Sequence, residues 1–205
     1  MKLQSFALHN YKNIPQINKL SPEQIEAIEV VGNVLPFKTN NYVVNELINW
    51  DDLDNDPMFK LTFPQKGMLN EEHYKAMKIV LDHTSSKDEI KKMANTIRQE
   101  LNPHPAGQIE HNVPEFNGEK INGMQHKYRE TVLFFPSQGQ TCHAYCTFCF
   151  RWPQFVGMDE LKFATKEASL LKDYVKANPQ VTDILFTGGD PMIMKAKVFA
   201  SYITP

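Results

Sequence analysis

The second half of the chain contains two short apolar segments of high β propensity, separated by a segment of helical pattern. The first spans 131–135 and the second 182–187. Apolar runs of this length are typical of strands covered on both faces. Between them, 165–178 has apolar residues at helical spacing and ends before Pro179. Two strands joined by a helical crossover pair in parallel with a right-handed connection, so the sequence predicts a βαβ unit.

The loops that follow the two predicted strands carry the residues of greatest chemical interest. The first loop leads to three cysteines within eight positions, and the second begins with Gly188-Gly189-Asp190. Both loops leave the carboxyl ends of parallel strands. They are therefore predicted side by side, on the edge of the sheet where α/β folds bind ligands.

The first half of the chain is predicted to be mainly helical. Three positions carry N-cap residues directly before segments of helical period: Ser21, Asn70, and Ser85 or Ser86. A further helix is expected within 41–50, and a last one is expected to begin near Ile193. Residues 102–125 contain three prolines and three glycines without any period. We expect a linker or a functional loop there.

Charge and hydropathy exclude several classes of protein. The chain has 22 Lys+Arg against 24 Asp+Glu, a formal charge of −2, which lacks the basic footprint of a nucleic-acid binder. No apolar run approaches the roughly 20 residues of a membrane span, and the first ten residues hold no apolar export core. We expect a cytoplasmic protein that binds neither nucleic acid nor a membrane.

The three cysteines, Cys142, Cys146 and Cys149, have the spacing Cys-x3-Cys-x2-Cys. An odd, closely spaced set is a poor disulfide framework and indicates metal ligands. Three thiolates at this spacing suit a [4Fe–4S] cluster whose fourth iron stays open to a substrate or cofactor, because the usual all-protein cluster needs four cysteines. Two alternatives remain: a zinc site with His143 or His126 as fourth ligand, and three unrelated thiols.

Gly188-Gly189-Asp190 is either a tight turn or a ligand site. The two glycines would let a ligand approach the backbone closely, and the carboxylate of Asp190 suits an ammonium or hydroxyl group. The predicted position beside the cysteine loop favours the ligand site.

Three segments together resemble the radical S-adenosylmethionine superfamily, and within it the lysine 2,3-aminomutase family. They are the cysteine segment 142–151, with Phe148 directly before its last cysteine; the downstream Thr187-Gly188-Gly189-Asp190; and the lead-in 126–134. The convincing likeness covers roughly residues 120–195.

This resemblance implies a set of site residues. Cys142, Cys146 and Cys149 would bind the [4Fe–4S] cluster, and S-adenosylmethionine would chelate the open iron. Gly188, Gly189 and Asp190 match the turn that receives the methionyl amino group, and Phe148 matches the aromatic residue beside the adenine. Arg151 matches an arginine that holds the substrate carboxylate, although it could instead only balance charge near the cluster. No catalytic residue is assigned.

The resemblance also implies a reaction and its cofactors. Electron transfer from the cluster to S-adenosylmethionine would generate a 5′-deoxyadenosyl radical for a 1,2-amino shift on an amino acid, with a flavodoxin- or ferredoxin-type electron donor. Pyridoxal phosphate is expected in the full-length enzyme, but Lys195 and Lys197 do not match its Schiff-base lysine. Lys127 and Arg129 could contact a phosphate, although solvated cations are the simpler interpretation. The alternatives are a radical enzyme without pyridoxal phosphate and a non-enzymatic zinc or redox-sensing module.

The predicted fold is α/β. A helical region and linker (1–125) precede the first βαβ unit of a partial (β/α)6 TIM-like barrel (126–205), which is apparently truncated and expected to be inactive by itself. A homo-oligomer is compatible with this interpretation.

Overall fold

The computed structural model describes residues 2–104, 107 and 110–204. They form two compact units. Unit 1 comprises Met1–Pro103 and His143–Trp152, and unit 2 comprises His104–Cys142 and Pro153–Pro205. These ranges differ from the expected domains 1–125 and 126–205, because most of the cysteine segment joins the N-terminal part of the chain. The division into domains stays a prediction.

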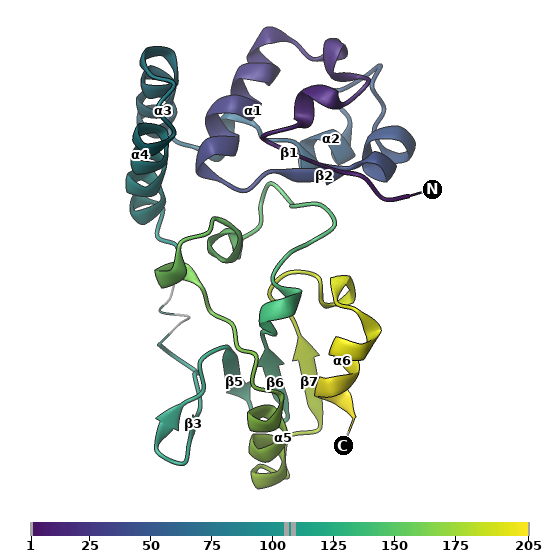
Figure 1. Cartoon of the computed structure of the whole chain (residues 1–205), viewed down its shortest axis with the longest axis vertical. Helices are drawn as coiled ribbons and strands as arrows, with labels where there is room; N and C mark the ends of the chain where they lie inside the picture. The colour runs from purple at the N-terminus through teal and green to yellow at the C-terminus, as the bar shows by residue number, and fades with distance from the viewer. Residues whose placement is uncertain (1, 105–106, 108–109, 205) are drawn as a thin grey trace. The chain divides into compact units, whose positions relative to one another are not determined.

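Unit 1 is mainly helical (Figure 1). Its longer elements are helices α1 (Pro22–Val34), α2 (Pro57–Thr62), α3 (Glu71–His83) and α4 (Lys87–Glu100) and the paired antiparallel strands β1 (Ser5–Ala7) and β2 (Lys38–Asn40). Its short helices are the 3-10 turns Tyr11–Asn13, Ile17–Lys19 and Lys66–Met68 and a π-helical turn, Val43–Leu47.

The predicted helix starts in unit 1 are confirmed, and their caps follow from the sequence. The side chain of Ser21 accepts from Gln24 N at 3.2 Å, and Gln24 Oε1 accepts from Ser21 N at 2.9 Å, which completes a capping box on α1. Asn70 caps α3, and Ser86 rather than Ser85 caps α4.

Two predictions in this half need correction. The helix expected within 41–50 is present only in its first part: Asn41 and Tyr42 are helical, the π-helical turn follows, and Ile48 is already extended. Helix α2 was not predicted from the sequence. Asp56 caps it, accepting from Phe59 N at 2.6 Å, and Pro57 takes the first helical position, so an Asp-Pro start signal was overlooked.

Two buried apolar clusters form the core of unit 1. The first packs α1, α2 and the N-terminal segment around the rings of Phe37, Phe59 and Phe63, with Phe59 stacked on Phe63 at 4.9 Å between centroids. The second joins α1, α3 and α4 through Val31, Met77 and Ile97, among others.

Unit 2 is built on a three-stranded sheet of order β5-β6-β7 (Figure 1). Its elements are strands β3 (Glu115–Phe116), β4 (Glu119–Lys120), β5 (Met124–Tyr128), β6 (Thr131–Phe134) and β7 (Asp183–Phe186), helices α5 (Ala168–Ala177) and α6 (Ala196–Ile203), and the 3-10 turns Ser137–Gly139, Asp159–Leu161 and Pro191–Ile193. A further 3-10 turn, Trp152–Phe155, begins on the last residue of unit 1.

The predicted βαβ unit is confirmed. Strands β6 and β7 pair in parallel, with Thr131 opposite Asp183 and Phe134 opposite Phe186, and α5 connects them in sequence. The third cluster packs against this sheet and includes Val132, Phe134, Leu171 and Tyr202. The fold is thus α/β, and the described residues form small sheets without a closed barrel.

The prediction of a linker or a functional loop over 102–125 is wrong for the second part of this range. Strands β3 and β4 form a hairpin around Asn117 (φ 53°) and Gly118 (φ 83°), and β5 begins at Met124 and pairs antiparallel with β6. Asn-Gly is a strong signal for a tight hairpin, because both positions accept positive φ. The absence of apolar periodicity concealed it.

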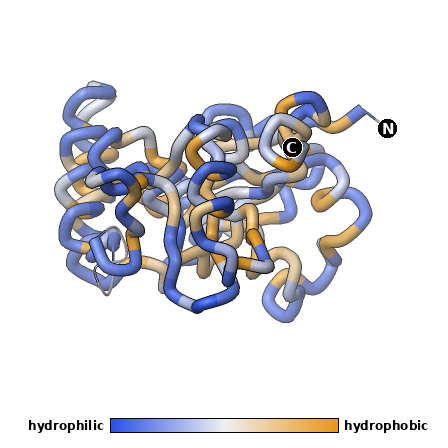
Figure 2. Tube along the Cα trace, turned by 90° about the horizontal axis from the view of Figure 1, so that it is seen from below, coloured by the Kyte–Doolittle hydropathy of each residue, from blue (hydrophilic) through white to orange (hydrophobic). Residues whose placement is uncertain are grey.

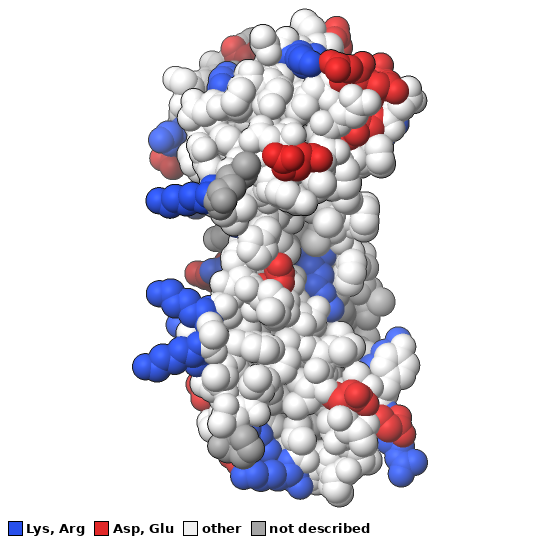
Figure 3. Space-filling model, turned by 90° about the vertical axis from the view of Figure 1, so that its right-hand side faces the viewer, with Lys and Arg blue, Asp and Glu red and all other residues white. Residues whose placement is uncertain are grey.

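Hydrophilic and hydrophobic residues are interspersed along the trace (Figure 2). Among the described residues, no helix combines the length and the apolar character that crossing a membrane requires. On the face drawn in Figure 3, Lys and Arg side chains are dispersed rather than gathered into one patch.

Candidate functional site

The Gly-Gly-Asp turn of unit 2 packs directly on the residues that precede Cys142. Asp190 N donates to Thr141 O at 2.7 Å, and Gln140 Nε2 donates to Pro136 O at 2.9 Å and to Thr187 O at 3.3 Å. The loops after β6 and β7 therefore lie side by side, as parallel pairing requires.

This packing leaves no room for a side chain at Gly189, and it crowds Gly188 with the side chain of Gln140. A Cβ on Gly189 would lie 2.6 Å from Gly139 O and would also collide with the backbone of Thr141. Gly188 has φ +117°, and a Cβ there would lie 2.7 Å from Gln140 Cδ. The close backbone approach expected from the sequence is thus made by the chain itself, and this packing role was not anticipated.

Asp190 also has a local role. It is the N-cap of the 3-10 turn Pro191–Ile193, and its Oδ1 accepts from Met192 N at 2.9 Å. A carboxylate in this position has further lone pairs, so capping and ligand binding are compatible.

The rest of the cysteine segment, from His143 to Trp152, belongs to unit 1 and bonds to strand β2 and helix α2. Tyr145 N donates to Lys38 O at 2.8 Å, and Asn40 Nδ2 donates to His143 O at 3.2 Å. Thr147 donates twice, from N to Leu61 O at 2.8 Å and from Oγ1 to Lys60 O at 2.9 Å. The sequence did not point to the partners Lys38, Asn40, Lys60 and Leu61. They lie about 100 residues before the cysteine segment, and contacts over such a separation produce no periodic pattern in the sequence.

None of the three cysteines forms a disulfide. Cys149 N donates to Cys146 O at 3.1 Å, so these two lie in one turn of unit 1, and Cys142 is the last residue of its segment of unit 2. Only three residues separate Cys142 from Cys146, which limits their Cα atoms to about 14 Å in any conformation.

Electrostatics around Cys149 involve Arg151. Burial raises the pKa of the Cys149 thiol, and the charge of Cys146 adds to this, while the backbone N–H and guanidinium of Arg151 act in the opposite direction. Burial lowers the pKa of Arg151, opposed by the thiolate of Cys149. The Arg151 guanidinium also lies over the ring of Phe150, 5.0 Å from its centroid. Arg151 is therefore close enough to balance charge at Cys149.

The aromatic residues of the segment are conspicuously open to solvent. Phe148 is 78% exposed and Phe150 is 62% exposed, on either side of Cys149. Large apolar side chains at such exposure are available to pack against a ligand.

The cysteine segment has the donor chemistry of an iron–sulfur site. Among the residues that the structure describes, no three His, Cys, Asp or Glu side chains form a group that could hold a metal ion. Three thiols within eight positions, none of them in a disulfide, nonetheless fit a cluster that is bound by three cysteines.

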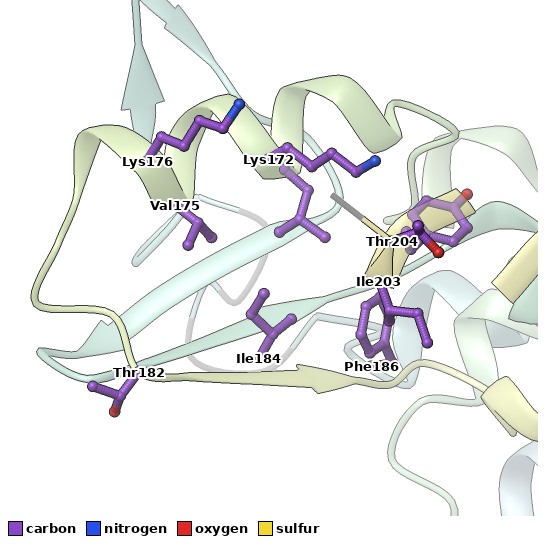
Figure 4. Close-up of a pocket in the computed structure, with 10 residues that line it drawn as sticks. Lys172, Val175, Lys176, Thr182, Ile184, Phe186, Ile203 and Thr204 are labelled. Carbon is purple, nitrogen blue, oxygen red and sulfur yellow. The ribbon is translucent and has the colours of Figure 1, made fainter. Parts of the chain in front are cut away.

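A separate groove of about 440 Å³ opens beside β7 (Figure 4). It is lined by Leu171, Lys172, Val175, Lys176, Thr182, Ile184, Phe186, Tyr202, Ile203 and Thr204. Val175 of α5 and Ile184 of β7 point toward one another across it. None of the site residues predicted from the sequence lines this groove.

Comparison with known proteins gives one consistent result. The chain is 28% identical over 178 residues to a putative L-lysine 2,3-aminomutase of Aquifex aeolicus, covering 87% of this chain and 37% of the relative. It is 33% identical over 81 residues to the L-lysine 2,3-aminomutase of Haemophilus influenzae (40% of this chain, 23% of the relative). It is 29% identical over 115 residues to the L-lysine 2,3-aminomutase of Acetoanaerobium sticklandii (56% of this chain, 27% of the relative).

Two further comparisons found nothing. No protein-family model matches the chain, and no solved structure matches it. The chain spans less than two fifths of the length of these relatives. The similarity supports a relationship to lysine 2,3-aminomutases, and hence to radical S-adenosylmethionine enzymes.

Proposed function

We propose that the chain is the cluster-binding part of a radical S-adenosylmethionine enzyme of the lysine 2,3-aminomutase type. The observation that carries this proposal is the position of the Gly188-Gly189-Asp190 turn, bonded to the residue before Cys142 by Asp190 N. The turn follows the strand beside the one whose loop leads to the three cysteines, and α/β folds bind ligands at this edge of the sheet. The relatives named lysine 2,3-aminomutase support the same conclusion.

The residues divide the work as follows. Cys142, Cys146 and Cys149 would hold the [4Fe–4S] cluster through their thiolates, and Gly188, Gly189 and Asp190 would bind S-adenosylmethionine by its polar groups, with Phe148 against the adenine. When bound, these groups would supply a 5′-deoxyadenosyl radical for hydrogen abstraction.

Arg151 would orient an amino-acid substrate by its carboxylate, because a guanidinium binds carboxylates through two parallel hydrogen bonds. Its partial burial and its proximity to Cys149 suit a position near the reaction centre. The proposed reaction is a 1,2-amino shift that also uses pyridoxal phosphate, with electrons from a flavodoxin- or ferredoxin-type donor. We place it in the cytoplasm, where thiols stay reduced.

The proposed fold is the opening of a partial (β/α)6 barrel. Strand β6 lies between β5 and β7, so further parallel strands would add at β7. Leu185 of β7 is 54% exposed, as expected of an apolar strand with an open face.

Anaerobic reconstitution tests the cluster. The wild-type chain should bind about four irons and four sulfides, and Cys146→Ala should lose them, since two thiolates do not retain the cluster. His143→Ala and His126→Ala are matched controls and should keep the iron. Zinc in the wild-type chain that is lost on changing either histidine would instead establish the zinc module.

Binding of S-adenosylmethionine is tested on the reduced cluster by electron paramagnetic resonance. The cofactor should change the spectrum of the wild-type protein. An unchanged spectrum from an intact cluster would contradict the proposal.

A further inference from the structure

The geometry points to Asn40 and Thr147 as positioning residues that hold the backbone around Cys146 on the N-terminal unit. The expected consequence of this anchoring, retention of the cluster, rests on the proposed function. The anchoring itself concerns unit 1 alone and is measurable without any cofactor.

The backbone of Cys146 is held from both sides. The residue before it, Tyr145, donates from N to Lys38 O, and the residue after it, Thr147, donates from N to Leu61 O, both at 2.8 Å. Lys38 Nζ also lies over the Tyr145 ring, 5.8 Å from its centroid. Two hydrogen bonds that flank a single residue restrict its position more than its own exposed side chain does.

Asn40 couples this anchor to the fold of unit 1. It is 4% exposed at the end of β2, and its Oδ1 accepts from Tyr42 N at 2.9 Å and from Val43 N at 3.1 Å, which starts the π-helical turn. Its Nδ2 donates to His143 O. The side-chain amide of Asn40 therefore bonds the local turn through Oδ1 and the cysteine segment through Nδ2. These bonds together fix the orientation of the amide.

Thr147 bonds to the end of α2. The last carbonyls of a helix have no partner within the helix, and those of Lys60 and Leu61 accept here from the hydroxyl and the backbone N–H of Thr147. The same residue thus satisfies two orphan acceptors and fixes the chain directly after Cys146.

The segment is also embedded by its apolar side chains. Ala144 packs against the first cluster of unit 1 and Trp152 against the second. The exposed residues Cys146 and Phe148 lie between these two attachments. The segment is consequently attached at its ends and by its backbone, while the side chains of Cys146 and Phe148 stay exposed to solvent.

Such anchoring matters because metal ligands are effective only when their supporting contacts hold them in place. Loss of a supporting hydrogen bond typically lowers metal affinity by about 10-fold to 100-fold. The hydrogen bonds described above join Asn40 and Thr147 to backbone groups, so these residues act through the backbone of the segment and not through the thiols.

Amide hydrogen exchange of the apo chain tests the anchor. Asn40→Asp keeps both acceptor contacts and removes the donor to His143 O, and Thr147→Val removes the hydroxyl at nearly constant shape. Each should make exchange of the Tyr145 and Thr147 amides about fivefold faster, the effect of one lost hydrogen bond. Thr147→Ser should restore the wild-type rate.

The matched control is Thr96→Val. Thr96 Oγ1 donates to a backbone carbonyl, Lys92 O, as Thr147 does, but within α4. It should leave exchange at 143–152 unchanged. Wild-type amides of Tyr145 and Thr147 that exchange as fast as an unstructured peptide, or variants that exchange at the wild-type rate, would overturn the anchor.

Iron release from the reconstituted protein to a chelator tests the consequence. Thr147→Val should release iron about tenfold faster than wild type, with Thr147→Ser and Thr96→Val at the wild-type rate. Iron release from Thr147→Val at the wild-type rate would overturn the positioning role of Thr147. If the wild-type chain binds no cluster, the proposed function fails, and hydrogen exchange alone then decides the anchor.

Discussion

The cysteine segment and the residues directly before it are held by different physical means. The residues before Cys142 pack on the Gly188-Gly189 turn at distances that exclude any Cβ. The residues around Cys146 are instead joined to β2 and α2 by hydrogen bonds, with ordinary spacing between the groups. A motif that is continuous in sequence thus depends on steric fit at one part and on directional bonds at the other. Steric fit fails abruptly, whereas individual hydrogen bonds are lost one at a time.

The largest effect is expected for Gly189→Val. Its side chain would overlap the backbone of Gly139 and Thr141, which cannot rotate away as a flexible side chain would. Forced overlap of this kind costs about 3 kcal/mol. Exchange of the Asp190 amide and of the β7 amides should rise strongly, as measured by hydrogen exchange with mass spectrometry.

Gly118→Val is the control for that substitution. Gly118, unlike Gly189, has a positive φ, so the substitution strains the backbone, but no atom lies within 4 Å of its Cβ position. It should show backbone strain in the hairpin without any change at Asp190. Equal protection of Asp190 in Gly189→Val and wild type would show that the turn is not closely packed.

Arg98→Met should have the next largest effect, and it sharpens the comparison by weakening unit 1. Arg98 is 9% exposed, and it donates from Nε to Val34 O at 2.6 Å and from Nη2 to Asn33 O at 2.9 Å, at the end of α1. Met keeps the apolar stem but leaves these carbonyls without a donor, at a cost of about 2 kcal/mol. Denaturant unfolding that follows α1 should show the loss, and Arg98→Lys should recover part of it.

Asn70→Ala should have a smaller effect, because it removes only the N-cap hydrogen bond of α3. Asn70 Oδ1 accepts from His73 N at 2.8 Å, and the loss of such a cap costs about 1 kcal/mol. Exchange at the start of α3 should become faster while the Tyr145 and Thr147 amides keep their rates. A parallel change at those two amides would mean that they report the stability of unit 1 and not a specific anchor.

The smallest effect concerns Glu26, which accepts from Lys78 and from Tyr74. The hydrogen bond from Lys78, followed by that from Tyr74, lowers the pKa of this carboxyl below its ordinary value. A depressed pKa means that the stabilisation is complete above the ordinary glutamate range and is lost as the pH falls through the folded-state pKa. Acidification from pH 6 toward 3 should therefore cost wild type about 1 °C more in melting temperature than Glu26→Gln.

Local sequence signals predicted much of each unit. The capping box at Ser21, the caps of α3 and α4 and the two strands of the βαβ unit were all readable, because each depends on neighbours in the chain. The hairpin at Asn117-Gly118 and helix α2 had equally local signals that were overlooked. Strand β5 was harder to predict, since its residues do not alternate between apolar and polar and its pairing with β6 is interrupted by a register shift between Gln125 and Tyr128.

The candidate site shows the same division. The cysteine spacing and the glycine turn are sequence features, and parallel pairing predicted that their loops would meet. The reason for the glycines, close contact with Gly139 and Thr141, appeared only in the folded chain. The proposed ligand roles of these residues stay predictions.

The amino-acid sequence alone therefore predicted where several helices and the two parallel strands begin, and it marked the residues proposed to carry the chemistry, because propensity, capping and motif spacing act over a few residues. Only the tertiary structure decided that Asn40, Lys38 and the end of α2 hold the segment around Cys146. A backbone hydrogen bond between residues about 100 positions apart requires no particular side chain. Its partners leave no trace in the sequence, and only the packed core that brings β2 and α2 to this segment selects them.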